Sequence, residues 1–289
     1  MVVAPNCAAP KIRWLMDHDR AIQRGLAKGR LLYGTIDTWL IWKLSGGAAH
    51  VTDLPSASLT LLLNAHTLSY DEWMLNELAI PREILPELRS SSEVYAYTSP
   101  DAFFGVRLPI AGSITDQRAA AFGQACFQPG MVKCTYDTGC SLILNTGQGC
   151  PPPTAGLSSL VLWALRGTVT RGLVGWTNVA GAAIQWLRDG LGIIRESEEA
   201  DWLAGQVPDT RGVYFVPAFA GLSAPRRDAY ARGALLGIDA GTTRQHVARA
   251  TLEALAYQVR DFFDIMERAA GIRLGVVRAD GGVAKSDFL

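Results

Sequence analysis

The chain has 289 residues, a length that suits about two domains with a substantial hydrophobic core. Its 27 Lys and Arg residues balance 27 Asp and Glu residues, so it lacks the basic surface that a nucleic-acid partner would need. No apolar run approaches the roughly 18 residues of a membrane-spanning helix, and the first residues lack the pattern of a secretory signal. Five cysteines without paired spacing favour free thiols. We therefore expect a soluble, cytoplasmic α/β protein of two domains.

Hydrophobic periodicity predicts alternating helices and strands. Apolar residues at three- and four-residue spacing predict helices that begin at residue 11 and that cover 34–44 and 244–269. A short helix is expected over 71–78, and small residues over 116–126 predict a helix packed closely against a neighbour. Apolar and β-branched runs predict strands over 134–145, 172–176 and 274–277, a buried strand over 212–217, and short strands with loops over 86–109. A Gly/Pro turn near 124–130 predicts a boundary between a domain at 1–124 and a domain at 125–289.

Two short strings resemble known catalytic loops but lack the context that the chemistry needs. The sequence Asp137-Thr138-Gly139 occurs in aspartic proteases, but these enzymes use two carboxylates that share a proton, and the chain has no second Asp-Thr-Gly. The sequence 239–243 resembles the phosphate hairpin of actin-like ATPases, yet a long amphipathic helix follows at once where a hairpin should follow. We therefore expect residues 239–243 to form a loop that ends in a threonine helix cap.

Two other features carry alternative interpretations. Asp116 stands after a glycine-bearing turn at the start of a predicted helix, where a carboxylate is either a plain cap or a general base beside a cleft. Asp280-Gly281-Gly282 follows an apolar strand, where it is either an ordinary turn or a place for close approach to a phosphate or nucleoside. The four histidines and five cysteines show no metal-ligand spacing, so we predict no protein-bound metal site.

Several strings, in order along nearly the whole chain, together resemble the FGGY carbohydrate kinases, and most closely those members that act on glycerol. They are residues 34–44, 52–53, 56–58, 80–86, 90–95, 135–140, 181–189, 216–219 and 230–260. The resemblance implies an actin-like ATPase (ribonuclease H-like) two-domain fold, with an incomplete first domain and both ends of the family pattern missing. It implies an enzyme that transfers phosphate from ATP, with Mg²⁺, to a polyol or sugar hydroxyl in the cleft between its domains, and that can form a homo-oligomer.

The resemblance also implies roles for particular residues. Asp116 corresponds to the general base that accepts the proton of the attacking hydroxyl, and Gln117 is its neighbour in the substrate site. The residues that correspond to nucleotide contacts are Thr138 and Gly139 at the phosphates, Gly181 and Gln185, and Gly281, Gly282 and Ser286 at the adenosine side. Phosphoryl transfer depends mostly on positioning and on charge stabilisation, and such a set would provide both.

Departures from the family pattern concentrate near the expected substrate. Asn6 and Cys7 stand in place of a Tyr-Phe pair whose Tyr contacts glycerol, and Ser141 replaces an aromatic residue. Because these changes leave the substrate pocket roomier and more polar, with Asn6 and Ser141 as substrate contacts, we expect a longer or more hydroxylated substrate than glycerol.

Three further departures bear on the nucleotide and on a nearby loop. Asp137 replaces a glycine next to the expected phosphates, Arg226-Arg227 replaces Tyr-Trp in a turn without an obvious partner, and Ser286 replaces an asparagine. The missing first-domain hairpin and Asp137 favour the alternative that the chain is a non-catalytic remnant acting as a binding module. The truncated first domain also predicts marginal stability, because part of its core would be uncovered.

Overall fold

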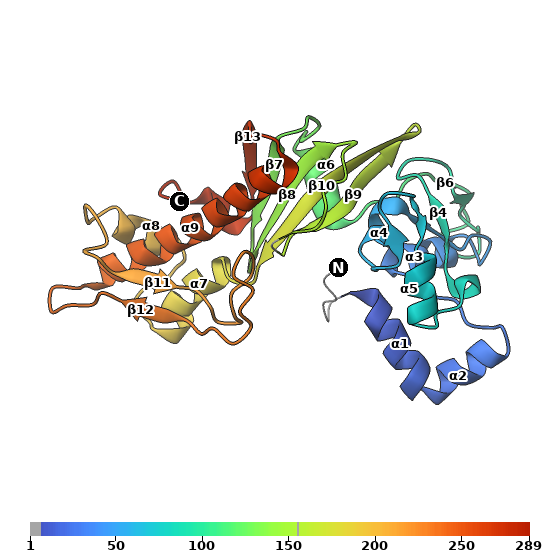
Figure 1. Ribbon diagram of the computed structural model, residues 1–289, viewed down its shortest axis with the longest axis horizontal. Helices are drawn as coiled ribbons and strands as arrows, with labels where there is room; N and C mark the ends of the chain where they lie inside the picture. Colours follow the sequence, from blue (N-terminus) through green and yellow to red (C-terminus); the bar gives the residue numbers. More distant parts are fainter. Residues whose placement is uncertain (1–6, 155) are drawn as a thin grey trace. The chain divides into compact units, whose positions relative to one another are not determined.

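The structure is a computed structural model that describes residues 7–154 and 156–289, and it divides into two compact units (Figure 1). Unit 1 comprises the chain up to Ala119 together with Gly147–Cys150 and Ser159–Gly172. Unit 2 comprises Ala120–Thr146, Pro151–Ser158 and Leu173–Leu289. No helix in the described part of the chain is long and apolar enough to cross a membrane.

The first part of the chain forms short helices and two-stranded sheets. The elements are α1 (Ala8–His18), α2 (Arg20–Ala27), α3 (Ile36–Leu44), β1 (Val51–Asp53), α4 (Leu54–Ser58), β2 (Leu63–Asn64), β3 (Ser69–Tyr70), α5 (Glu72–Glu77), η1 (Arg82–Ile84), β4 (Glu87–Arg89), β5 (Ala96–Tyr97) and β6 (Pro109–Ile110). Strands β1 and β4 pair in parallel, whereas β2 pairs with β3 and β5 with β6 in antiparallel fashion. The predicted helices at 11, 34–44 and 71–78 are confirmed as α1, α3 and α5.

Aspartate caps decide where several of these helices begin. Asp19, Asp53 and Asp71 each accept a backbone N–H from the first turn of α2, α4 and α5, respectively. The apolar stripe of α1, with Ile12 and Met16, packs against Leu62 and the buried face of α5, so the three- and four-residue spacing buries one side of the helix.

The rest of the chain contains a five-stranded sheet and the longest helix. The elements are α6 (Asp116–Gly123), β7 (Met131–Tyr136), β8 (Cys140–Gly147), β9 (Ser158–Leu165), β10 (Thr168–Thr177), α7 (Gly181–Gln185), η2 (Trp186–Gly190), α8 (Glu199–Ala204), β11 (Tyr214–Val216), β12 (Ala234–Leu236), α9 (Arg244–Ala270), β13 (Val276–Asp280) and η3 (Gly282–Lys285). The strand order in the large sheet is β13-β7-β8-β10-β9; β13 is parallel to β7, and β7 is antiparallel to β8.

Helix α9 provides the centre of the unit 2 core. Its buried face contains Leu252, Leu255, Val259, Phe262 and Met266, as the sequence pattern predicts. Close packing against the sheet depends on a residue without a side chain, because a Cβ at Gly175 would lie 2.5 Å from the Phe262 ring.

Two sequence expectations about strands are wrong. Residues 134–145 are not one strand: the chain reverses at Asp137-Thr138-Gly139, where the Asp137 N–H donates to the Gly139 carbonyl (2.8 Å), and β7 and β8 form a hairpin. The strand predicted at 212–217 is restricted to β11, and it is not fully buried, because Tyr214 is 58% exposed. Strand β9 was not predicted, although its apolar residues 160–163 mark a core segment.

Candidate functional site

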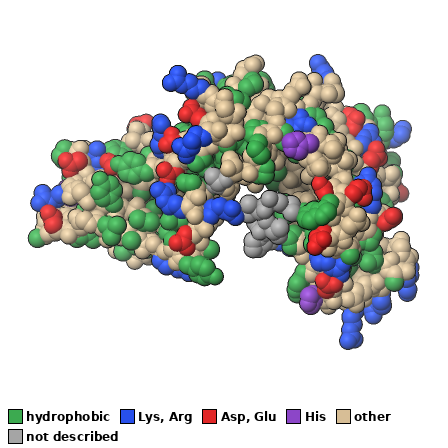
Figure 2. Space-filling model, in the orientation of Figure 1, with side chains coloured by type: hydrophobic (Ala, Val, Ile, Leu, Met, Phe, Trp, Pro, Cys, Tyr) green, Lys and Arg blue, Asp and Glu red, His purple; other side chains and the backbone are tan. Residues whose placement is uncertain are grey.

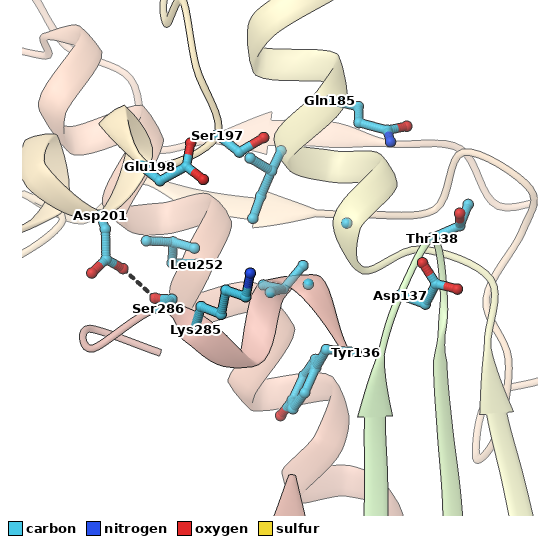
Figure 3. A pocket seen from close by; sticks show the side chains of 14 residues that line it. Tyr136, Asp137, Thr138, Gln185, Ser197, Glu198, Asp201, Leu252, Lys285 and Ser286 are labelled. Carbon is cyan, nitrogen blue, oxygen red and sulfur yellow. Dashed lines mark hydrogen bonds between the residues drawn. The ribbon is translucent and has the colours of Figure 1, made fainter. Parts of the chain in front are cut away.

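A pocket of about 400 Å³ lies in unit 2, and segments far apart in the sequence form its walls (Figure 3). They come from the β7–β8 turn, from α7, from the start of α8, from α9 and from η3. The lining residues are Tyr136, Asp137, Thr138, Gly181, Ile184, Gln185, Ser197, Glu198, Asp201, Leu252, Gly282, Val283, Lys285 and Ser286.

The β7–β8 turn is joined to α7 through backbone hydrogen bonds. The Thr138 carbonyl accepts the N–H groups of Ala180 (2.8 Å) and Ala182 (3.1 Å), and the Asp137 carbonyl accepts the N–H of Gly181 (2.8 Å). A Cβ at Gly181 would lie 2.7 Å from the Asp137 oxygen, and one at Gly139 would lie 2.2 Å from the Thr177 oxygen. Glycine is therefore required at both positions for the backbones to meet.

Strand β13 brings the glycine pair to the same hairpin. Asp280 lies opposite Thr135 in the parallel register of β13 and β7. Gly281 has a φ of 92°, and a Cβ there would lie 2.0 Å from the Tyr136 carbonyl oxygen. The conformation and the contact both exclude a side chain, and they place η3 beside the β7–β8 turn.

Hydrogen bonds fix the end of η3 against α8. The Ser286 hydroxyl donates to the Asp201 carboxylate, whose other oxygen accepts the N–H of Phe288 (3.2 Å). The Ser286 oxygen accepts the N–H of Leu289 (2.9 Å). Asp201 thus holds one wall of the pocket in place through its two oxygens.

The pocket lining carries three carboxylates, Asp137, Glu198 and Asp201, and one ammonium group, that of Lys285. Figure 3 shows Asp137 and Thr138 on the right side of the pocket, and Glu198 and Asp201 on the left side, with Lys285 between them and lower in the view. Among the residues that the structure describes, neither Asp137 nor Lys285 takes part in a side-chain hydrogen bond or an ion pair, and both are available to a ligand.

Beneath the turn lie two buried thiols, Cys134 and Cys140, whose sulfur atoms are 3.4 Å apart. The hydrogen bond to Cys134, together with burial, raises the pKa of the Cys140 thiol, so this group stays neutral. All five cysteines are free thiols, in agreement with the expectation from their spacing.

Asp116, the expected base, is the first residue of α6. Its exposed carboxylate accepts a hydrogen bond from the Gln117 amide (3.2 Å), and both residues belong to unit 1. The fully buried Arg118 follows, and burial lowers the pKa of its guanidinium to about 10, although attraction to Asp116 and Asp53 opposes that shift. Within the described residues, Nε and Nη2 of Arg118 have no hydrogen-bond partner.

Asp53 is the other buried charge in this region of unit 1. Its side chain accepts the N–H of Ser56 (2.9 Å) and the hydroxyl of Ser91 (3.2 Å). Burial raises the pKa of Asp53 to about 6, which these hydrogen bonds only partly oppose. The sequence analysis gave no functional role to Arg118 or Asp53. The position of Arg118 among the small residues of α6 could have indicated that its side chain is buried.

The structure brings together most of the residues expected at the nucleotide. Thr138, Gly181, Gln185, Gly282 and Ser286 all line the pocket, with Gly139 and Gly281 adjacent in the chain.

One expected substrate contact, Ser141, lies away from this pocket. Ser141 lies within β8, is 3% exposed and is not part of the pocket lining, and Asn6 lies outside the described residues. Their roles stay predictions.

The sequence expectation holds for the loop before α9 and fails for the Arg226-Arg227 turn. Residues 239–243 form the expected loop before α9, and the Thr243 N–H donates to Nδ1 of His246 (3.1 Å) at the helix start. The expectation that the Arg226-Arg227 turn lacks a partner is wrong, because Arg226 forms an ion pair with Asp261 on α9.

No three His, Cys, Asp or Glu side chains come together to hold a metal ion in 7–154 or 156–289. Mg²⁺ in phosphate-transfer sites usually has one or two protein carboxylates and completes its coordination with phosphate oxygens and water. The unpaired Asp137 carboxylate fits that mode, so the residues of the pocket suit a cation that arrives with a phosphate ligand.

Comparison with known proteins agrees with this geometry. Residues 1–123 match the N-terminal domain of the FGGY family of carbohydrate kinases, and residues 132–289 match the C-terminal domain of the same family. The chain belongs to the FGGY family of carbohydrate kinases.

Similar proteins in the family are glycerol kinases. The chain is 50% identical to the glycerol kinase of Geobacillus sp. (strain WCH70) and 49% identical to glycerol kinase 2 of Thermotoga maritima, over all of its residues and 58% of each relative. The crystal structure of Plasmodium falciparum glycerol kinase with ADP matches with a TM-score of 0.90 at 36% identity, over 97% of this chain and 56% of that one. The family resemblance and the actin-like ATPase fold predicted from the sequence are confirmed. The chain spans a little more than half the length of these relatives.

Proposed function

We propose that this chain forms part of an ATP-dependent kinase that phosphorylates a hydroxyl group of a polyol or sugar. The observation that carries the proposal is the pocket of unit 2, which gathers Thr138, Gly181, Gln185, Gly282 and Ser286 from three separate segments. These are residues that the family resemblance assigns to the nucleotide. Further support comes from the relatives, which are glycerol kinases, one of them crystallised with ADP.

The pocket offers suitable contacts along the length of a nucleotide. We place the phosphates at the β7–β8 turn, where Asp137 and Thr138 line the pocket. The nucleoside then extends toward η3, where the absence of a side chain at Gly282 leaves space and Leu252 provides an apolar surface.

In the proposed reaction, Asp116 is the general base. Its carboxylate accepts the proton of the substrate hydroxyl while that oxygen attacks the terminal phosphorus atom of ATP and ADP departs. Mg²⁺ bound with the nucleotide would neutralise phosphate charge. Gln117 supports the base, because its amide donates a hydrogen bond to the Asp116 carboxylate and fixes the orientation of that group.

For the substrate, we propose a polyol longer than glycerol or a sugar. The support is the loss of two aromatic residues relative to the family pattern, at positions 6 and 141. Rates of phosphorylation of glycerol, erythritol and xylulose, measured on the chain joined to the segments that its longer relatives carry, test this choice. A clear preference for glycerol would contradict it.

A thermal shift experiment on the chain itself tests the nucleotide site. Mg-ATP at about 100 times its Kd adds about 2.7 kcal/mol of stability. For a chain of this size, the midpoint of unfolding should rise by about 5 to 10 °C. Mg²⁺ alone and Mg²⁺ with inorganic phosphate are the controls. A saturable shift with Mg-ATP only supports the kinase, whereas no shift favours the alternative of a binding module without nucleotide.

A further inference from the structure

Asp137 occupies an unusual place in the pocket. It is the first residue of the β7–β8 turn, and its exposed side chain stands next to Thr138 on the right side of the pocket in Figure 3. Its backbone is fully engaged: the N–H donates to Gly139, and the carbonyl accepts from Gly181. Its carboxylate has neither a hydrogen bond nor an ion pair with any described residue, so no described side chain pairs with its charge.

The rest of the lining does not cancel this charge. Glu198 and Asp201 add two more carboxylates, and Lys285 supplies one ammonium, so the lining has a net charge of −2. Lys285 lies away from Asp137 in Figure 3 and forms no ion pair with it. A polyphosphate that enters without a cation therefore meets repulsion, which is strongest at the wall that carries Asp137.

We propose that Asp137 makes this pocket select the divalent-cation complex of a nucleoside triphosphate over the metal-free nucleotide. The inference rests on the proposed function, since it takes the phosphates to lie at the β7–β8 turn. Metal-free ATP is repelled by the Asp137 carboxylate. In the complex with a divalent cation, part of the phosphate charge is neutralised, and the same carboxylate faces a cation that prefers oxygen ligands.

The selectivity can be measured as a ratio of two dissociation constants. Isothermal titration calorimetry of the chain with ATP in EDTA, and with ATP in excess MgCl₂ at matched ionic strength, gives the ratio of Kd without metal to Kd with Mg²⁺. We expect Asp137→Asn to bind metal-free ATP about tenfold more tightly than the unaltered chain, because one like charge is removed close to the phosphates. Binding of Mg-ATP should weaken or stay the same, so the ratio falls at least tenfold.

Glu198→Gln is the matched control, because it removes the same charge from the left side of the pocket in Figure 3. It should change the ratio by less than about threefold, since charge effects fall with distance and with screening. A second measurement needs no variant: added salt should improve binding of metal-free ATP to the unaltered chain more than binding of Mg-ATP.

The outcomes separate this inference from the proposed function. Tighter binding of metal-free ATP in Asp137→Asn alone supports it, and a damaged fold cannot produce a gain of affinity. Equal ratios in the unaltered chain and Asp137→Asn, or equal changes in Asp137→Asn and Glu198→Gln, would overturn the inference while leaving the nucleotide site intact. Absence of ATP binding in both conditions would overturn the proposed function and this inference together.

Discussion

The pocket of unit 2 and the region around Asp116 in unit 1 obtain their geometry in different ways. In the pocket, Gly139, Gly181 and Gly281 let three stretches of backbone meet at distances that no side chain would permit. Around Asp116, the determining groups are ionisable side chains. Two nitrogens of the buried Arg118 have no hydrogen-bond partner among the described residues, and the Asp53 carboxyl is buried as well.

This difference predicts different sensitivities. A pocket whose shape depends on backbone contacts should lose that shape when a single methyl group is added, yet the stability of its fold should respond little to pH. A site held by buried charged groups should tolerate small changes of shape. It should be sensitive to substitutions that remove a charge and to the protonation of its groups. Substitutions and changes of pH in the two regions test this contrast.

The largest effect is expected at the proposed base. Asp116→Asn keeps the size of the side chain but removes the proton acceptor, so kcat should fall by about 10² to 10⁴ while the KM for ATP changes little. The rates are measured on the chain joined to the segments that its longer relatives carry. Glu77→Gln, a loss of the same charge on the exposed side of α5, is the control. A kcat within a few-fold of the unaltered protein would show that Asp116 is not the base.

The backbone character of the pocket is tested by two neighbouring glycines. Gly281→Ala should lower the free energy of unfolding by about 3 kcal/mol and abolish nucleotide binding, because its φ is 92° and its Cβ would lie 2.0 Å from the Tyr136 oxygen. Gly282→Ala should leave the free energy of unfolding nearly unchanged, since a Cβ there has no described heavy atom within 4 Å. Urea denaturation measures the stability of both variants, and ATP titration measures the loss of binding in Gly281→Ala. An equal loss of stability in the two variants would show that the close backbone contact at Gly281 does not hold the pocket together.

The charge character of the other region is tested by pH. The pKa of Asp53 is raised by burial from 3.8 to about 6, so between these pH values the folded state retains a proton that the unfolded chain has released. The contribution of Asp53 to the free energy of unfolding is therefore present at about pH 4 and is lost as the pH rises to about 6. This loss amounts to roughly 3 kcal/mol.

Asp53→Asn removes this titration while it preserves the cap to Ser56. Urea midpoints between pH 4 and 7 should then decline less in the variant than in the unaltered chain. Parallel curves would show that the burial of Asp53 does not control this part of the pH dependence.

The sequence predicts regular elements better than it predicts the connections that build the site. The stripe of α9 identifies that helix because its apolar residues recur with the helical period, and they do form the buried face. By contrast, residues 134–145 looked like one strand, because the alternation of apolar residues gives no sign of the reversal at Asp137-Thr138-Gly139. A turn of this kind depends on a backbone contact with Gly181, which is distant in the sequence.

The candidate site shows the same limit. The family resemblance indicated the lining residues Thr138, Gly181 and Gln185 in advance, and the structure gathers them at one pocket. Burial of Arg118 and Asp53 could not be predicted, since it results from packing of segments around them rather than from local pattern. The burial of Ser141 could not be predicted either, because it results from the packing of the complete sheet.

The smallest effect is expected at the start of α9, which supports unit 2 without lining the phosphate turn. His246 accepts the Thr243 N–H at Nδ1, and the Thr243 hydroxyl lies 2.9 Å from the same atom. Because this contact satisfies a free donor at the helix start, His246→Ala should lower the free energy of unfolding by about 1 kcal/mol. His66→Ala, in an exposed turn, is the control and should have no effect. ATP affinity should be unchanged in both variants, because the pocket is held by the glycine contacts of β7–β8, α7 and β13; a loss of affinity in His246→Ala would show that the pocket depends on the anchoring of α9 as well.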